Sequence, residues 1–238
     1  MPSRALEGLT LLSISSLDRS TLNDRVYDDL RQMIIAGRLR PGQVISIRSL
    51  AEVLGVSSMP VRGALQRLVA EGAIESRANR TFALPVLNPQ SLMEIAHIRS
   101  ELEGMAVEAA VGNLDETDFK YLTDINHQMF DGTPDWTNYL ELNRIFHFHI
   151  YRKAGMPRLL RLIEGMWLQI GPLLNFVATS SALAGGSETH RDLVRALAEK
   201  DARGARVTIQ RDILVAARQI VVTLTEQRDG SDRAVAER

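Results

Sequence analysis

The 238-residue sequence contains no cysteine, and only 5% of its residues are aromatic. Without thiols the chain has no disulfide framework, thiolate zinc site or cysteine nucleophile, so a metal would be held by histidines and carboxylates. No apolar run approaches the roughly 18 residues of a membrane span, and the stretch at residues 9–14 is too short for a secretory signal. The 45% of apolar residues excludes a disordered chain. We therefore expect a cytoplasmic protein that does not associate with membranes.

Net charge is also nearly absent, at −1 for the whole chain. This value hides a division. Residues 20–85 hold nine arginines against six acidic residues, a net charge of +3, whereas residues 86–238 hold 17 basic and 21 acidic residues, a net charge of −4. A basic N-terminal third joined to an acidic remainder is expected when a nucleic-acid-binding module is fused to another domain.

The N-terminal third, residues 20–85, shows the pattern of three helices followed by a β-hairpin. Apolar residues recur at helical spacing, and glycines end the periodic segments. The predicted elements are helices at 22–36, at 47–54 and from Ser57 or Ser58 to Gly72, and β-prone runs at 43–45, 74–77 and 81–84. This order predicts a winged helix-turn-helix.

The segment around the second and third helices carries the steric signature of a helix-turn-helix. Ala51, Gly55 and Val61 have the required spacing of a small residue, a turn glycine and a branched apolar residue, which lets two helices cross closely. The exposed start of the third helix holds Ser57, Ser58, Met59 and Arg62. Arg62 can contact a guanine edge or a phosphate. Any helical pair with a glycine turn gives a similar pattern, but the hairpin and the charge division favour DNA binding.

The same segment contains a longer motif. It consists of Leu50-Ala51, the run GVSSMPVRGAL at residues 55–65, then Leu68 and Glu71-Gly72. On these residues, the region 24–86 resembles the N-terminal domain of the GntR family of bacterial transcription regulators. The resemblance implies DNA contacts at Arg48, Ser57 and Arg62.

Three positions depart from the family pattern. Ser58 replaces an arginine, Gly63 replaces a glutamate, and Asn79 with Thr81 replaces the usual glycine of the wing. Loss of a cationic contact should lower DNA affinity or shift the preferred operator. The candidate DNA-contacting residues are Arg48, Ser57, Ser58, Met59, Arg62, Asn79 and Arg80.

The remainder of the chain is predicted to be an all-helical antiparallel bundle, so the fold class is mainly α. A linker at 86–90 precedes a helical domain at 91–227, while residues 1–19 form a flexible segment and 228–238 a disordered tail. Breaks are expected at Gly112-Asn113, 131–134, 155–157 and Gly185-Gly186. The predicted helices cover 89–112, 115–130, 135–154, 157–178, 187–199 and 202–227.

All five histidines lie in this helical half, at positions 97, 127, 147, 149 and 190. Asn143 and His147 are four residues apart and therefore point to one face of their predicted helix. His149 faces elsewhere, so His147 and His149 do not form a chelating pair. A lone histidine is more often structural than a ligand.

Several short motifs of this half match a second known pattern. They are IRSELE at 98–103, NRIFH at 143–147 with Ile150-Tyr151, ETHRDL at 188–193, and Asp201-Ala202 with Ala205. On these residues, the region 91–225 resembles the all-helical FCD domain of the FadR subfamily, in its six-helix VanR-like branch. In many members of that group an aspartate and three histidines bind a divalent metal that helps to hold a carboxylate ligand.

The resemblance places the metal-ligand positions at Asn143, His147, His190 and Asp212. Both of these histidines are kept, whereas Asn143 replaces the family aspartate and Asp212 replaces the last histidine. Two histidines and one carboxylate still suit zinc, nickel or iron, with Asn143 as a weak oxygen ligand. A divalent metal is thus the candidate cofactor.

A metal-free pocket is the alternative. His147, His190 and Arg99 would then bind an anionic effector directly, because arginine binds carboxylates through two parallel hydrogen bonds. Arg99 has a second interpretation, as a surface residue paired with Glu103 one turn away. The candidate effector-binding residues are Arg99, Asn143, His147, His190 and Asp212.

Three functions are compatible with these features. The leading hypothesis is a ligand-responsive regulator that binds a palindromic DNA operator as a homodimer, since two symmetric recognition helices multiply specificity. The family resemblance implies repression and a small organic-acid effector. A metal-dependent hydrolase or oxygenase using His147, His190 and Asp212 is disfavoured, because no general base or nucleophile is recognisable beside the metal set. The third hypothesis is a constitutive DNA-binding regulator with a degenerate effector pocket.

Overall fold

Three helices and a small antiparallel sheet form the N-terminal part of the computed structural model, which describes residues 22–78, 81–130, 136–177 and 183–236. The strands are arranged in the order β1-β3-β2, so that Ile45 and Ser76 both pair with Phe82. The elements are α2 (Leu22–Ile35), β1 (Val44–Ser46), α3 (Ile47–Leu54), α4 (Ser58–Ala70), β2 (Glu75–Arg77) and β3 (Thr81–Ala83). The predicted winged helix-turn-helix is confirmed, and the extended piece after α2 adds a third strand to the wing.

Local signals account for the boundaries of α3. The hydroxyl of Ser46 accepts a hydrogen bond of 3.0 Å from the backbone N–H of Ser49 and so caps the N-terminus of the helix. Gly55 ends the helix with a φ of 65°, a left-handed conformation that glycine adopts without strain. Ala51 and Val61 are buried where α3 and α4 meet, as the helix-turn-helix requires.

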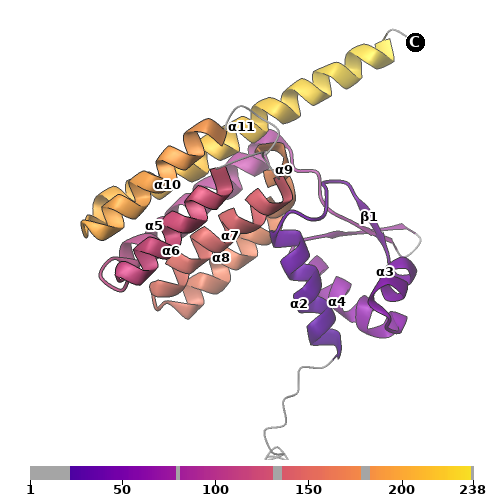
Figure 1. Cartoon of the computed structure of the whole chain (residues 1–238). Coiled ribbons are helices and arrows are strands. Elements are labelled where there is room, and N and C mark those ends of the chain that lie inside the picture. Colours follow the sequence, from indigo (N-terminus) through magenta and orange to yellow (C-terminus); the bar gives the residue numbers. More distant parts are fainter. Residues whose placement is uncertain (1–21, 79–80, 131–135, 178–182, 237–238) are drawn as a thin grey trace, which may run out of the picture.

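The C-terminal part contains only helices within the described residues, and the predicted mainly α fold is confirmed. Asn88 caps the first of them through the N–H of Ser91, with Pro89 at the first helical position. Figure 1 shows these helices packed side by side, with the last one continuing beyond the bundle. They are α5 (Pro89–Ala110), α6 (Glu116–Phe130), α7 (Trp136–Lys153), α8 (Pro157–Ile170), η2 (Gly171–Leu173), α9 (Leu174–Val177), α10 (Leu183–Ala198) and α11 (Ala202–Ala236).

Three helix boundaries differ from the expected ones. The helix expected at 157–178 stops at Ile170 and passes through the 3₁₀ turn η2, where Pro172 cannot donate a backbone hydrogen bond. Gly185 and Gly186 lie inside α10 instead of breaking it, and a Cβ at Gly186 would come within 3.2 Å of the Phe130 ring. Helix α11 continues to Ala236, past the expected end at 227.

Buried apolar side chains form one core that extends from the N-terminal helices into the bundle. Trp167, Tyr151 and Phe146 are the largest fully buried side chains. Helix α2 lies between α4 on one side and the bundle on the other, as Figure 1 shows. Among the described residues, no helix has both the length and the apolar character needed to cross a membrane.

Candidate functional site

The start of α4 presents the predicted DNA-contacting side chains to solvent. Ser57 precedes the helix and makes no capping hydrogen bond with its side chain, while Pro60 and Val61 anchor the first turn in the core. Ser57, Ser58 and Arg62 are exposed, and Met59 is 81% exposed. Arg62 forms no ion pair with any residue that the structure describes. Its guanidinium is therefore available to a nucleic acid.

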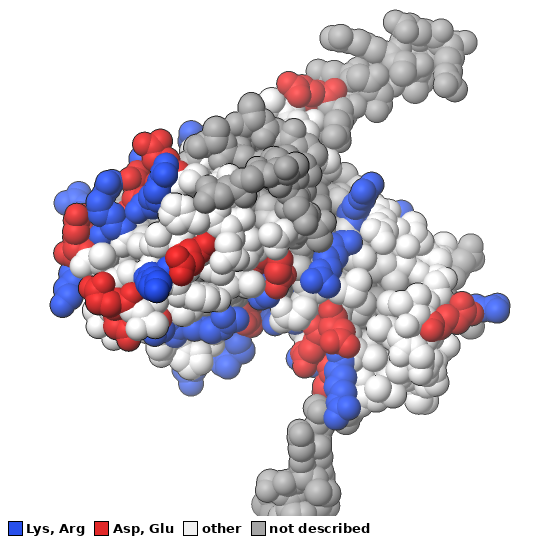
Figure 2. Space-filling view, in the orientation of Figure 1, with Lys and Arg blue, Asp and Glu red and all other residues white. Residues whose placement is uncertain are grey.

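The other residues of the predicted DNA interface are Arg48 on α3 and the wing residues Asn79 and Arg80. Arg48 lies exposed on α3, where its Nε is 3.0 Å from Oε1 of Glu52, and a pair this exposed contributes little stability. Asn79 and Arg80 lie outside the described residues. On the face shown in Figure 2, basic and acidic side chains are intermixed over the helical domain.

Three ionisable side chains from three helices converge inside the C-terminal bundle. His147 comes from α7, His190 from α10 and Asp212 from α11, and their possible ligand atoms all lie within 4.8 Å of one another. Nε2 of His147 is 3.6 Å from Oδ2 of Asp212, and Nε2 of His190 is 3.9 Å from Oδ1. We call these three residues the polar centre.

Burial controls the protonation of the polar centre. Burial lowers the pKa of His147 well below its usual value, and the nearby His190 and Arg99 act in the same direction. Burial lowers the pKa of His190 to about 3. Both imidazoles are therefore neutral at pH 7. Burial raises the pKa of Asp212 to about 7, although the positive charge of Arg99 opposes this shift.

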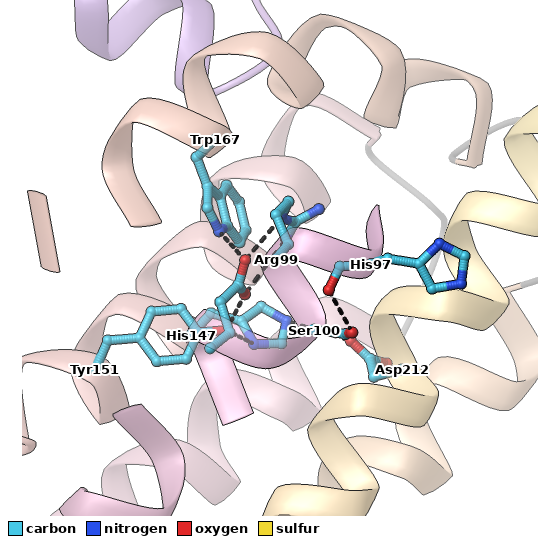
Figure 3. Close-up of polar contacts among 8 residues, drawn as sticks. His97, Arg99, Ser100, His147, Tyr151, Trp167 and Asp212 are labelled. Atoms are coloured by element: carbon cyan, nitrogen blue, oxygen red, sulfur yellow. Dashed lines mark hydrogen bonds and ion pairs between the residues drawn. The ribbon is translucent and has the colours of Figure 1, made fainter. Parts of the chain in front are cut away.

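A second layer of buried polar residues surrounds Glu103, which has no exposed surface. Its carboxylate accepts hydrogen bonds from Arg99 Nε at 2.6 Å, from Trp167 Nε1 at 3.0 Å and from the Tyr151 hydroxyl. The guanidinium of Arg99 also lies over the Trp167 ring, 4.7 Å from its centroid. Figure 3 shows Arg99, Trp167 and Tyr151 gathered there beside His147.

The second layer continues to the polar centre through Tyr151. The Tyr151 hydroxyl lies 3.4 Å from Nδ1 of His147, one turn earlier on α7. This leaves Nε2 of His147 on the side of Asp212. Because metal-binding histidines usually hydrogen-bond through the second ring nitrogen, this arrangement suits a ligand at Nε2.

The remaining predicted site residues have different environments. Arg99 is paired with Glu103, as the second interpretation proposed, but the pair is buried and does not lie on the surface. Asn143 is half-buried one turn before His147 on α7. Sequence reasoning missed Tyr151 and Trp167 as neighbours of the site. The spacing of four residues from His147 could have indicated Tyr151, whereas no local spacing connects Trp167 to Glu103.

The polar centre fits a divalent metal ion. In a tetrahedral zinc site each ligand atom lies about 2.1 Å from the ion, so two ligand atoms lie roughly 3.4 Å from each other. The distances from the two histidine Nε2 atoms to the Asp212 carboxylate are slightly longer than this. Neutral imidazoles offer their lone pairs without losing a proton. Nδ1 of His190 is buried and has no hydrogen-bond partner among the described residues, so this ring, unlike that of His147, has no partner opposite a ligand at Nε2.

Known proteins share both halves of this chain. Residues 22–83 match the family "Bacterial regulatory proteins, gntR family", and residues 94–214 match the "FCD domain". The chain is 35% identical to the HTH-type transcriptional regulator McbR of Escherichia coli K12 over 191 residues, which cover 78% of this chain and 86% of McbR.

Solved structures show the same architecture. The structure of Escherichia coli McbR/YncC superposes with a TM-score of 0.76 at 32% identity, covering 87% of this chain and 99% of that chain. A GntR regulator from Rhodococcus, at 22% identity and a TM-score of 0.69, covers 84% of this chain and 97% of its own and shares the fold.

A winged helix-turn-helix joined to a helical bundle that encloses a polar centre defines a two-domain transcription regulator. The two family matches cover most of the described chain. The chain belongs to the GntR family and carries an FCD domain. It is a transcription regulator and not an enzyme, so the hypothesis of a hydrolase or oxygenase is dropped.

Proposed function

We propose that this regulator is a ligand-responsive repressor, which binds a palindromic operator as a homodimer and senses a small organic acid through a divalent metal at the polar centre. The convergence of His147, His190 and Asp212 from three helices carries the proposal. Repression is supported by a relative from Paenarthrobacter nicotinovorans named "Probable D-xylose utilization operon transcriptional repressor". It is 29% identical over 187 residues, which cover 78% of this chain and 82% of the relative.

The charges around the polar centre favour a metal over a metal-free anion pocket. Both histidines are neutral at pH 7, and the charge of Arg99 is compensated by Glu103. The remaining ionisable member of the centre is Asp212, which is negative when ionised. An anionic effector would gain nothing from such a site, whereas a divalent ion makes it net positive. The bound metal would supply a cation for the effector carboxylate.

The residues of the chain have separate roles in this proposal. Nε2 of His147, Nε2 of His190 and the Asp212 carboxylate hold the ion, with Asn143 as the fourth, neutral candidate. The Tyr151 hydroxyl orients the His147 ring. At the DNA, Arg62 reads a base edge or a phosphate, while Arg48, Ser57, Ser58, Met59 and the wing residues Asn79 and Arg80 position the domain.

The proposed homodimer is supported by the limited number of base pairs that one recognition helix can contact. One recognition helix contacts only a few base pairs, so a palindrome read by two symmetric copies gives the specificity that an operator requires. Analytical ultracentrifugation should show two chains per particle, and footprinting should show two protected half-sites. A monomer that protects a single half-site would contradict this part of the proposal.

The sensing proposal is tested with chelator-treated protein. Zinc, nickel or cobalt should raise its melting temperature, and isothermal titration should show about one ion per chain. A panel of small carboxylates should then change the affinity for a duplex selected from random-sequence DNA, and only in the presence of metal. His190→Ala should remove the metal response.

The alternative function is a constitutive regulator with a degenerate pocket. The replacement of the family aspartate by Asn143 supports it, because a neutral ligand weakens metal binding. If no metal and no carboxylate changes either the stability of the protein or its DNA affinity, the constitutive regulator is correct and the sensing proposal fails.

A further inference from the structure

Helix α8 and the turn η2 that follows it contact the DNA-binding domain through Glu164 and Gly171. Glu164 Oε2 is 2.8 Å from Nη2 of Arg31 on α2, and both side chains are mostly buried. Directly after α8, Gly171 packs against the end of α2. A Cβ atom at Gly171 would lie 2.4 Å from the carbonyl oxygen of Ile34 and 2.8 Å from that of Ile35.

The close contact at Gly171 allows the two domains to pack in this way only because glycine has no Cβ atom. The atoms that a Cβ would meet are backbone atoms of α2, which cannot turn aside as a side chain can. An alanine there can be accommodated only if α2 and the start of η2 move apart. Gly165, which lies on α8, differs because a Cβ there would meet nothing within 4 Å.

Helix α8 also reaches the neighbourhood of the polar centre, through Trp167. The indole donates its hydrogen bond to Glu103, and its ring centroid is 5.8 Å from that of His147. Trp167 lies between Glu164 and Gly171 in the sequence, so α8 together with the turn η2 contacts both α2 and the residues beside the polar centre.

Helix α2 is in turn tied to the DNA-reading helix. The Tyr27 hydroxyl donates a hydrogen bond of 2.8 Å to the carboxylate of Glu71, at the end of α4. The guanidinium of Arg67, on α4, stacks 3.6 Å from the centroid of the Tyr27 ring. A movement of α2 would therefore carry α4 with it.

We infer that α8 transmits ligand binding at the polar centre to the DNA-reading helix α4. The contacts of Gly171 with α2 and of Glu164 with Arg31 connect the two domains, and we call these two contacts the joint. This inference rests on the proposed function in assuming a ligand at the polar centre. A ligand that draws His147 toward Asp212 alters the packing on Trp167, and the contacts of Glu164 and Gly171 pass this change to α2. By linkage, DNA binding then changes the metal affinity by the same factor that metal changes the DNA affinity.

The joint itself is tested without any ligand. Because the chain has no cysteine, spin labels can be placed at Val53→Cys on α3 and Leu162→Cys on α8, two exposed positions, in protein diluted with unlabelled chains. The distance distribution between the labels should be narrow in the otherwise unchanged protein and in Gly165→Ala, and shifted or broadened in Gly171→Ala. An unchanged distribution in Gly171→Ala overturns the inference.

Transmission is tested with zinc as the probe and a duplex selected from random-sequence DNA. Zinc should change the DNA dissociation constant of the unaltered protein and of Gly165→Ala by about fivefold or more. In Gly171→Ala the change should fall below about twofold while zinc still binds. If zinc binds but leaves the DNA affinity of the unaltered protein unchanged, or changes it equally in Gly171→Ala, the inference is overturned.

A second variant covers the case in which Gly171→Ala does not fold. Glu164→Gln keeps the size of the side chain and removes only the charge that pairs with Arg31, and it should reduce the zinc effect on DNA affinity at least about twofold. An unreduced effect overturns the inference. If zinc does not bind the unaltered protein, the proposed function fails, and the spin-label distances alone decide whether the joint exists.

Discussion

Arg99 and Glu103 form an ion pair inside the helical domain, one turn apart on α5, with Nε 2.6 Å from Oε1. The carboxylate of Glu103 is the common acceptor for Trp167 on α8 and Tyr151 on α7 as well. This single side chain therefore holds three helices together beside the polar centre.

Glu103→Gln should destabilise the protein strongly, by about 3 kcal/mol. The substitution leaves the guanidinium of Arg99 buried without a counter-charge, and breaking a buried pair from one side is costly. Urea unfolding at pH 7 gives the difference in the free energy of unfolding. Glu101→Gln, an exposed residue of the same helix that pairs with Arg206, is the control and should cost less than about 1 kcal/mol. Equal effects of the two variants would contradict the central role of Glu103.

Asn143→Asp should strengthen metal binding by about tenfold or more. The change adds an anionic oxygen at the position where the family resemblance implies an aspartate, and anionic ligands bind divalent ions more tightly than amide oxygens. Isothermal titration with zinc gives both affinities. Asn138→Asp adds the same charge at an exposed position of the same helix, outside the set of possible ligands, and should leave the affinity nearly unchanged. No gain in Asn143→Asp would mean that this residue does not reach the ion.

Metal binding should strengthen as the pH rises through 7. Burial raises the pKa of Asp212 to about 7, so below this pH the ion must displace a proton from the carboxylate. The apparent affinity should increase by about tenfold per pH unit below pH 7 and become constant above about pH 8. The two histidines have lowered pKa values and stay neutral throughout, so they add no pH dependence in this range. Titrations with zinc between pH 6 and 8 test this, and Asp212→Asn should remove the slope. A flat profile in the unaltered protein would refute the assignment.

Arg62→Ala should weaken binding to the selected duplex by about 1–3 kcal/mol and relax the preference at the base that it contacts. The side chain is exposed at the start of α4 and has no ion-pair partner among the described residues. Gel-shift titrations at one fixed salt concentration measure the effect. Arg158→Ala removes the same charge at an exposed position on α8 and should change the affinity little. An unchanged footprint for Arg62→Ala would exclude it as a reading residue.

Much of the DNA-binding domain was predictable because its signals are local. The cap at Ser46, the left-handed turn at Gly55 and the buried Val61 each depend on a few neighbouring residues. The helical domain was predictable in its class for the same reason, since apolar residues at helical spacing show that a face is buried. Two of the three differences in helix boundaries lie at Gly171 and Gly186, where a glycine packs closely against a distant segment.

The polar centre was only partly accessible from sequence. The residues His147, His190 and Asp212 came from family resemblance, and their ligand atoms do lie within one cluster. The protonation of that cluster was not predictable, because it depends on burial. The bond from Trp167 to Glu103 spans 64 residues of sequence. Periodicity shows that such a residue is buried, but not which helix it meets.

The sequence by itself determined most of the helices, the caps at Ser46 and Asn88, the helix-turn-helix and the types of residue available to hold a metal, since these follow from short-range sterics and hydrogen bonding. Only the tertiary structure decided that the charge of Arg99 is compensated by Glu103 within the core. It also decided that Gly171 lies against the last carbonyls of α2. Both are consequences of how helices distant in the sequence pack, and packing depends on the shapes of both partners at once.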